Sequence, residues 1–426
     1  MEHEAHVVAQ QILESMHHAG FEESRVSVTF TEQDELNIAH NEPALLRSTE
    51  DYNLAISGIV DGRKASTTLS DIDSAAIGAA ISSIRDSVSS APQDEANRFS
   101  ADQHMTVEQG PLECDRDLLS KKALELLEFR AATTPKVMIE EFAASHRLRR
   151  SCELTSRDTT LSSVVGCYSL GGMCIASEGG KTSSLNFTGG NANDLSEKMG
   201  SEWFGLGEML RDTERQIHTR ALGPHFTGAV VLAPTAVTDL VSWFLQQLGS
   251  RALIAGSSVY RQSVGEAVAA PTLSLQSDFS AAGHTPFSTD GFIAPAITLI
   301  DNGILTSLLP DLYSSLKTGS PHTPSASSWR ISPGAESRKA LIEGVERGAL
   351  VTRFSMGRPA ANGDFSGVIK NSFIIEDGAV GEALSETMVA GNMKQMLRDI
   401  NGISKEHINY GGEDFPWIRI PNMHFS

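Results

Sequence analysis

The chain has 426 residues, with 34 lysines and arginines against 53 aspartates and glutamates and a formal net charge of −19. Nucleic-acid binding depends on lysine and arginine neutralising phosphates, so this charge disfavours it, and the one short basic run, residues 146–150, is interpreted as a solvated strand end. The N-terminus has no signal-peptide pattern, no stretch is apolar enough to span a membrane, and four cysteines indicate no disulfide framework. We therefore expect a cytoplasmic protein with no nucleic-acid or membrane partner.

Residues 1–90 predict a small α+β unit. Apolar residues recur at helical spacing over 5–19, and alternating apolar residues predict antiparallel strands over 26–69. Asp71 is a suitable N-cap for a second helix that ends near Ser87.

A linker and a second unit follow. Residues 91–112 contain Pro, Gly and polar residues without apolar periodicity, which is typical of a linker. Residues 113–221 repeat the helix–strands–helix order, with a helix at 115–130, strands between 136 and 180, and a long helix at 193–219. A turn at 169–172 is predicted to bring Cys167 and Cys174 near each other as buried thiols.

Residues 222–426 predict a β-rich domain. A strand at 227–232 leads through Pro234 into a helix that ends at Gly249, and most of the remainder reads as short strands between Gly, Pro, Asn and Asp turns. The expected fold class is therefore α+β, with two small helix–antiparallel-sheet units followed by a larger β-rich C-terminal domain.

The most specific motif lies in this third region. Asn362, Gly363, Asp364, Phe365 and Ser366 combine a turn with the start of a strand, because Asn and Gly accept the positive φ that tight turns need. Between this turn and the turn Asp377-Gly378, one buried strand is predicted by Val368, Ile369, Phe373, Ile374 and Ile375. We expect positive φ at Gly363 and at Gly378.

The sequence of this motif resembles the signature of the TldD/TldE (PmbA) family, which comprises heteromeric metallopeptidases also called modulators of DNA gyrase. Similar segments occur in the family's order at 300–305, 329–334, 340–351 and 390–393. The resemblance covers residues 222–426 well and the N-terminal half more loosely.

The resemblance implies that the catalytic subunit carries His-Glu-x-x-x-His on the helix after the first strand of this region, completed by a distant Cys. This chain has the helix at 234–249, but no His occurs between His225 and His284 and no Cys occurs after Cys174. It therefore resembles the TldE/PmbA subunit. We expect no catalytic residue, metal ligand or cofactor in this chain, and zinc or another divalent metal in the partner subunit.

The expected function is that of a non-metal-binding subunit of a heteromeric metallopeptidase. It would help to form the cavity in which a TldD-like partner carrying His-Glu-x-x-x-His hydrolyses unfolded peptides or peptide-like amides. The turn–strand residues Asn362, Gly363, Asp364, Phe365 and Ser366 are the expected contacts to peptide or partner, and the chain could pair with itself in isolation. The alternatives are a regulator that binds DNA gyrase, a peptidase subunit of a natural-product pathway, and a hydrolase that acts alone. Whether the chain is itself an enzyme stays open.

Overall fold

The computed structural model describes residues 2–325, 327–385 and 387–426 of the chain. Its strands form two β-sheets, of 8 strands in the N-terminal half and 14 strands in the C-terminal half. Helices pack against both sheets, which confirms the predicted α+β class with a larger β-rich C-terminal region. No helix in these described ranges is both long and apolar enough to cross a membrane.

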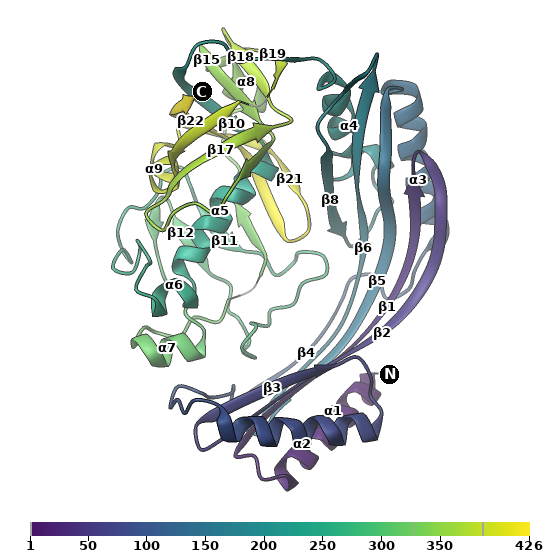
Figure 1. Cartoon of the computed structure of the whole chain (residues 1–426), viewed down its shortest axis with the longest axis vertical. Coiled ribbons are helices and arrows are strands. Elements are labelled where there is room, and N and C mark those ends of the chain that lie inside the picture. Colours follow the sequence, from purple (N-terminus) through teal and green to yellow (C-terminus); the bar gives the residue numbers. More distant parts are fainter. Residues whose placement is uncertain (1, 326, 386) are drawn as a thin grey trace.

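The N-terminal half contains, in chain order, α1 (Glu2–His18), β1 (Glu23–Ala39), β2 (Glu42–Val60), β3 (Arg63–Leu69), α2 (Ser74–Ser90), β4 (Gln103–Gln109), α3 (Arg116–Thr133), β5 (Val137–Thr155), β6 (Thr159–Glu178), β7 (Lys181–Thr182), β8 (Asn186–Ala192), the 3₁₀ helix η1 (Gly200–Gly205) and α4 (Leu206–Arg215). In Figure 1 the long strands curve from α1 and α2 at one end to α3 and α4 at the other, and the C-terminal region lies on their concave side.

One continuous sheet joins the two predicted N-terminal units. Its strand order is β3-β2-β1-β5-β6-β4, with β7 and β8 also paired to β6. Val28 of β1 lies opposite Leu54 on one side and Cys152 on the other, so β1 belongs to both units. Strand β4, in the stretch predicted as a linker, pairs with β6 in parallel. The proposed domain boundaries stay predictions.

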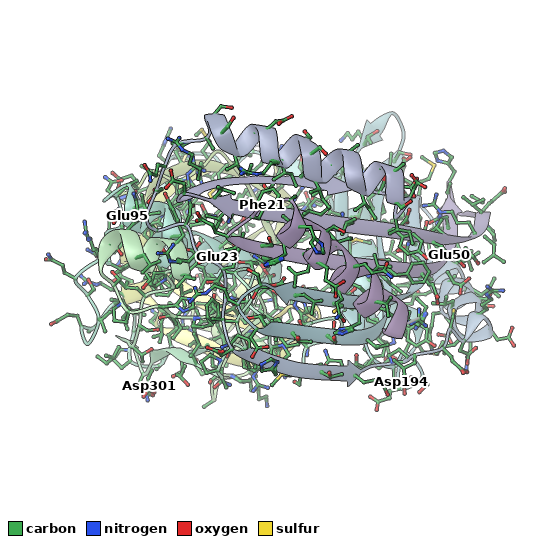
Figure 2. All side chains as sticks on the ribbon, turned by 90° about the horizontal axis from the view of Figure 1, so that it is seen from below. Phe21, Glu23, Glu50, Glu95, Asp194 and Asp301 are labelled. Atoms are coloured by element: carbon green, nitrogen blue, oxygen red, sulfur yellow. The ribbon has the colours of Figure 1, made fainter. Side chains whose placement is uncertain are left out.

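Two groups of helices cover this sheet. Helices α1 and α2 bury apolar residues against β1, β2 and β5, and they lie in front of the strands when the molecule is seen from below (Figure 2). Helix α2 is capped by Asp73, not by Asp71 as predicted, because the Asp73 carboxylate accepts from the N–H groups of Ala75 and Ala76. Helices α3 and α4 pack together over β5 and β6.

The turn predicted at residues 169–172 is wrong. Strand β6 runs unbroken through it, paired with β5 on one side and β8 on the other. The glycines serve close packing here: a Cβ on Gly172 would lie 2.4 Å from the Glu141 carbonyl oxygen. Cys167 and Cys174 are both buried at different places along this strand.

The C-terminal half contains, in chain order, β9 (Thr219–Arg220), β10 (Phe226–Leu232), α5 (Pro234–Leu248), α6 (Ser250–Ile254), β11 (Leu275–Ser277), β12 (Thr298–Asp301), β13 (Ile304–Leu305), α7 (Leu312–Thr318), β14 (Trp329–Ile331), α8 (Arg338–Glu343), β15 (Arg347–Val351), β16 (Arg353–Met356), β17 (Asp364–Lys370), β18 (Phe373–Glu376), β19 (Ala379–Leu384), β20 (Met388–Asn392), α9 (Met393–Asp399), β21 (Gly402–Asn409) and β22 (Glu413–Phe425). Strands β22, β10 and β15 lie at the middle of the second sheet.

The second sheet has a core on each face. The larger core packs α5 and α9 against the sheet, and the smaller one packs α8 against Val231, Leu350 and Trp417. Neighbouring residues of β10, Val230 and Val231, belong to opposite cores, as the alternation of side chains in a strand requires.

Candidate functional site

Helix α5 follows β10 directly, where the resembled family would place two metal-binding histidines. Pro234 suits the first helical turn, and an apolar stripe that includes Val237, Leu240 and Phe244 is buried, which fixes the helix on the sheet. One of its polar residues is tied to the backbone that follows β15: the Thr235 hydroxyl donates to the Thr352 carbonyl at 2.6 Å. In the described parts of the chain, no three His, Cys, Asp or Glu side chains are grouped so that they could hold a metal ion. The residues on this helix do not fit the family's metal site.

A carboxyl group on α5 is nevertheless perturbed. Burial, and secondarily the charge of Glu413, raises the pKa of Asp239 to about 6. Burial also raises the pKa of Glu413, whose Oε2 accepts from the Thr238 hydroxyl at 2.5 Å. The helix thus presents a carboxyl pair that the sequence did not reveal, because only the returning strand β22 brings Glu413 to α5.

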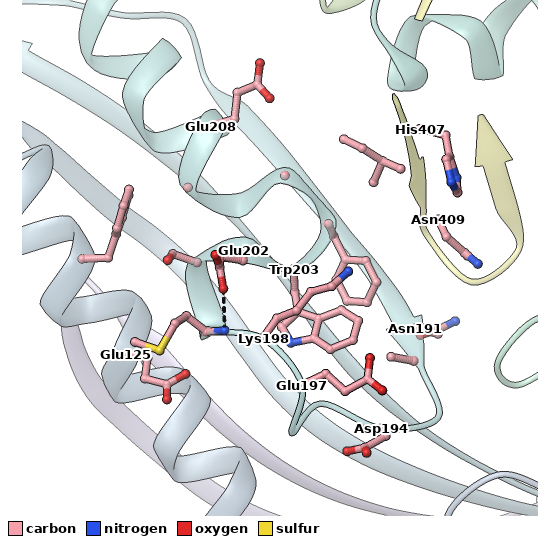
Figure 3. Close-up of a pocket in the computed structure, with 18 of the residues that line it drawn as sticks. Glu125, Asn191, Asp194, Glu197, Lys198, Glu202, Trp203, Glu208, His407 and Asn409 are labelled. Carbon is pink, nitrogen blue, oxygen red and sulfur yellow. Dashed lines mark hydrogen bonds between the residues drawn. The ribbon is translucent and has the colours of Figure 1, made fainter. Parts of the chain in front are cut away.

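A cleft of about 1190 Å³ opens between the two halves of the molecule. It is lined by α3, by the segment from Asn191 to Gly205, by α4, and by the hairpin of β21 and β22 that carries His407 and Asn409 (Figure 3). The volume of this cleft exceeds that of a typical small-molecule pocket.

The cleft is strongly acidic. Besides His407, its basic side chains are Lys198 and Arg211. Its carboxylates are Glu125, Glu128, Asp194, Glu197, Glu202 and Glu208. Both cations lie over aromatic rings, with Lys198 4.8 Å from the centre of Trp203 and Arg211 5.2 Å from the centre of Phe129. This lining favours cationic groups over anionic ones.

Four of these six carboxylates have partners within the chain, among them Asp194, which accepts from the Ser196 N–H at 2.7 Å. Glu125 pairs with Lys122 at 3.0 Å, Glu202 accepts from the Met199 N–H at 2.9 Å (Figure 3), and Glu208 pairs with Arg338 at 2.5 Å. Two further acidic side chains, Glu128 and Glu197, pair with no base of the described residues. They supply the charge available to a ligand.

The floor of the cleft depends on a break in the helix predicted at 193–219. Phe204 has φ 51° and Gly205 has φ 72°, so η1 and α4 are separate. Phe204 is buried and fixes this kink, and a Cβ on Gly200 would lie 2.2 Å from the Lys122 carbonyl oxygen. Gly200, Gly205 and Gly207 are the sequence signal that could have predicted the break.

A smaller crevice of about 50 Å³ continues from the cleft to the start of α5. The two share Phe204, Glu208 and Trp417, and the crevice is also lined by Pro234 and Thr235. The indole N–H of Trp417 is buried and has no hydrogen-bond partner among the described residues. It is an unsatisfied donor between the cleft and the helix that lacks the metal ligands.

The structure places the five predicted contact residues elsewhere: none of them lines the cleft or the crevice. Asp364 accepts from the side-chain amides of Asn362 at 2.7 Å and Asn392 at 2.8 Å, and these bonds lower its pKa. Phe365 is buried against Phe354, while Ser366 is exposed on β17. Their role toward peptide or partner stays a prediction.

The turn around Gly363 has the backbone expected from the sequence. Gly363 has φ 96° and Gly378 has φ 76°, so both predicted positive φ angles are confirmed. The Gly363 carbonyl accepts from the Met393 N–H at 2.8 Å, which attaches the turn to the start of α9. The described geometry therefore gives this motif a clear structural role.

Residues 227–426 match the family model described as the PmbA/TldA metallopeptidase C-terminal domain. The predicted resemblance to the PmbA/TldD family is confirmed. The chain is 29% identical over 247 residues to the metalloprotease PmbA of Escherichia coli O157:H7, covering 55% of this chain and 52% of that protein. It is 25% identical over 235 residues to a zinc metalloprotease TldD homolog of Saccharolobus solfataricus, covering 50% and 53%. The chain thus spans about half the length of these curated relatives.

Two crystal structures share the fold over almost the whole chain. TldE from Thermococcus kodakarensis superposes with a TM-score of 0.84 at 19% identity, covering 98% of this chain and 100% of that one. A Bacteroides thetaiotaomicron protein described as a modulator of DNA gyrase also gives 0.84, at 20% identity and 99% coverage of each chain. At these identities the match establishes the fold alone. The family is of metallopeptidase type.

Proposed function

We propose that this chain is a non-metal-binding, peptide-holding subunit of a PmbA/TldD-type metallopeptidase, and that a homologous partner with His-Glu-x-x-x-His supplies the metal. One observation carries the proposal. The C-terminal region matches a metallopeptidase domain, yet helix α5 has an apolar stripe and packed threonines where the resembled family would have metal ligands. Hydrolysis then takes place on the partner, and this chain contributes binding.

The acidic cleft gives that binding a chemical preference. Glu128 and Glu197 are unpaired among the described residues, and Trp203 and Phe129, each with a cation of this chain over its ring, are also in the lining. Lysine and arginine side chains of an unfolded peptide can pair with the carboxylates while their aliphatic stems pack on the rings. The preferred substrates are therefore extended peptides with basic residues.

The experiment compares the isolated chain, the isolated partner and their mixture on an unstructured basic peptide. We expect a stable complex on size-exclusion chromatography, hydrolysis only with the partner present, loss of hydrolysis with a chelator, and no stoichiometric transition metal in this chain by elemental analysis. Equal activity of the isolated chain, or one tightly bound transition metal per chain, would refute the proposal.

The cleft is tested with paired charge variants. Glu128→Gln with Glu197→Gln should raise KM for a basic peptide, and less so at high salt, because salt screens the charges that remain in the wild type. Glu50→Gln with Glu95→Gln is the matched control: both residues are exposed and Figure 2 shows them far from one another at the margins of the molecule. An equal rise in KM in both variants would show that overall charge, and not the cleft, governs binding.

A further inference from the structure

A second cavity, of about 400 Å³, lies on the first sheet away from α1 and α2. Strand alternation explains its polar surface. Val28 and Cys152 point into the core beneath α1, so the intervening residues Ser27, Thr29 and Ser151 face the other way and line the cavity. The loop that contains Thr285 and Ser288 closes it from the C-terminal half, and its volume is that of a small-ligand pocket.

One end of this cavity holds an ion pair. Glu153 pairs with Arg25 through its Oε2 at 2.6 Å, and burial raises the pKa of Glu153. Its Oε1 is directed at the loop, since a Cβ built on Gly291 would lie 2.3 Å from it. Glu153 and Arg25 thus form an ion pair within the wall, while the buried Oε1 of Glu153 has no hydrogen-bond partner among the described residues.

The other end holds an uncompensated cation. The only hydrogen bond of the Arg149 guanidinium in the described structure is a long one of 3.4 Å to the Gly283 carbonyl, and neither Arg149 nor Arg147 forms an ion pair with a described carboxylate. Burial and the charge of Arg147 lower the pKa of Arg149. The pKa of His284 is lowered by burial and by both arginines, although Asp278 acts in the opposite direction.

These arginines belong to the basic run at 146–150, which the sequence analysis interpreted as a solvated strand end. It lies inside β5, and only alternate residues share the cavity face. Arg150 lies on the other face, where it pairs with Glu32 at 2.8 Å. A partly buried guanidinium without a counter-ion is costly, and an anionic ligand removes that cost. The absence of a carboxylate partner for Arg149 among the described residues contrasts with the net charge of −19 of the chain.

We propose that this cavity binds the C-terminal carboxylate of a short peptide, with Arg149 pairing to the carboxylate and the hydroxyls of Ser27, Thr29 and Ser151 bonding to the peptide groups. Arginine presents a planar fork that matches a carboxylate. Hydroxyls both donate and accept, which suits the alternating N–H and C=O groups of a peptide. The proposal rests on the proposed function only for the choice of a peptide as the ligand.

The cavity and the acidic cleft are connected by one loop. Ser280 and Ala282 line the cleft, Thr285 and Ser288 line the cavity, and the carbonyl of His284 between them accepts a hydrogen bond from Gln109. One loop thus lines both the acidic cleft and the cavity that contains Arg149.

The test uses the isolated full chain and isothermal titration calorimetry with tetra-alanine as its free acid and as its C-terminal amide. We expect the acid to bind about tenfold or more tightly than the amide, because the charge-assisted pair is lost with the carboxylate. Arg149→Gln should lower the affinity for the acid to that of the amide, and Arg149→Lys should restore part of it. Arg150→Gln, on the opposite face of the same strand, should leave the affinity unchanged.

Equal binding of acid and amide to the wild-type chain would overturn the proposal even if no Arg149 variant folds. Undiminished binding by a folded Arg149→Gln, checked by its thermal unfolding, would also overturn it. Inorganic phosphate is titrated separately: binding of phosphate without any binding of the peptide acid would exclude a peptide site. None of these measurements needs the metal-bearing partner, so the cavity and the proposed peptidase role can fail independently.

Discussion

At the residue scale, two aspartates of the C-terminal half show how the surroundings set the pKa of a carboxyl group. Burial raises the pKa of Asp239 on α5 to about 6. Hydrogen bonds from Asn392 and Asn362 lower the pKa of the exposed Asp364. The residue type is the same, but one carboxylate has lost water and the other has gained donors.

These shifts have opposite consequences for stability. The folded-state pKa of Asp239 lies above its ordinary 3.8, so the folded chain binds this proton more tightly than the unfolded chain does. Its contribution is complete below a pH of about 4 and is lost as the pH rises through about 6. We expect Asp239→Asn to raise the free energy of unfolding, relative to wild type, more at neutral than at acidic pH, measured by urea denaturation.

Asp364→Asn is the control of opposite sign. The lowered pKa of Asp364 means that its contribution is present at neutral pH and is lost as the pH falls through that lowered value. This variant should be destabilised at neutral pH, and the difference from wild type should shrink in acid. Parallel stability curves for wild type and both variants would contradict the assignments.

At the element scale, the turn at 360–364 attaches β17 to two helices. The indole N–H of Trp243 on α5 donates to the Ala360 carbonyl at 3.3 Å, and the amide of Asn392, which caps α9, donates to the Asn362 carbonyl at 3.0 Å. The sequence predicted the turn because its residues are local. It could not predict these attachments, because α5 lies more than a hundred residues earlier in the chain.

Gly363→Val tests this attachment. Gly363 has φ 96°, and a Cβ there would lie 3.0 Å from the Asn392 side chain and 3.1 Å from the Lys394 backbone nitrogen. We expect a loss of ~1 kcal/mol or more in the free energy of unfolding, since valine is strained at positive φ. Gly357→Val is the matched control, because a Cβ at Gly357 meets nothing within 4 Å. Equal stability of the two variants would show that the turn is not constrained. Size-exclusion chromatography of each variant mixed with the partner subunit separately tests whether the motif shapes an interface.

At the scale of the whole molecule, the first sheet is shared by the two units predicted in the N-terminal half. The core beneath α1 and α2 includes Cys152 and Leu154 from β5, although β5 belongs in sequence to the second predicted unit. Ile38 of β1 in turn packs in the core beneath α3.

We therefore expect that residues 1–90 alone do not fold, because β1 would lose its β5 partner from Arg25 to Ala39, whereas residues 1–221 retain the complete sheet. Circular dichroism and amide-proton dispersion in NMR distinguish the outcomes. A folded 1–90 fragment would show instead that the predicted boundary at residue 90 separates an autonomous domain.

The sequence by itself determined the family resemblance, the α+β class, helix α5 with its missing metal ligands, and the turns at Gly363 and Gly378. Each of these is encoded by residues close together in the chain: an apolar period, a proline, or a glycine that tolerates positive φ. The tertiary structure alone decided the continuous first sheet, the kink at Phe204, the acidic cleft and the Arg149 cavity. These depend on which segments meet across large separations and on which charges lose water when they meet, because burial and pairing are properties of the folded chain.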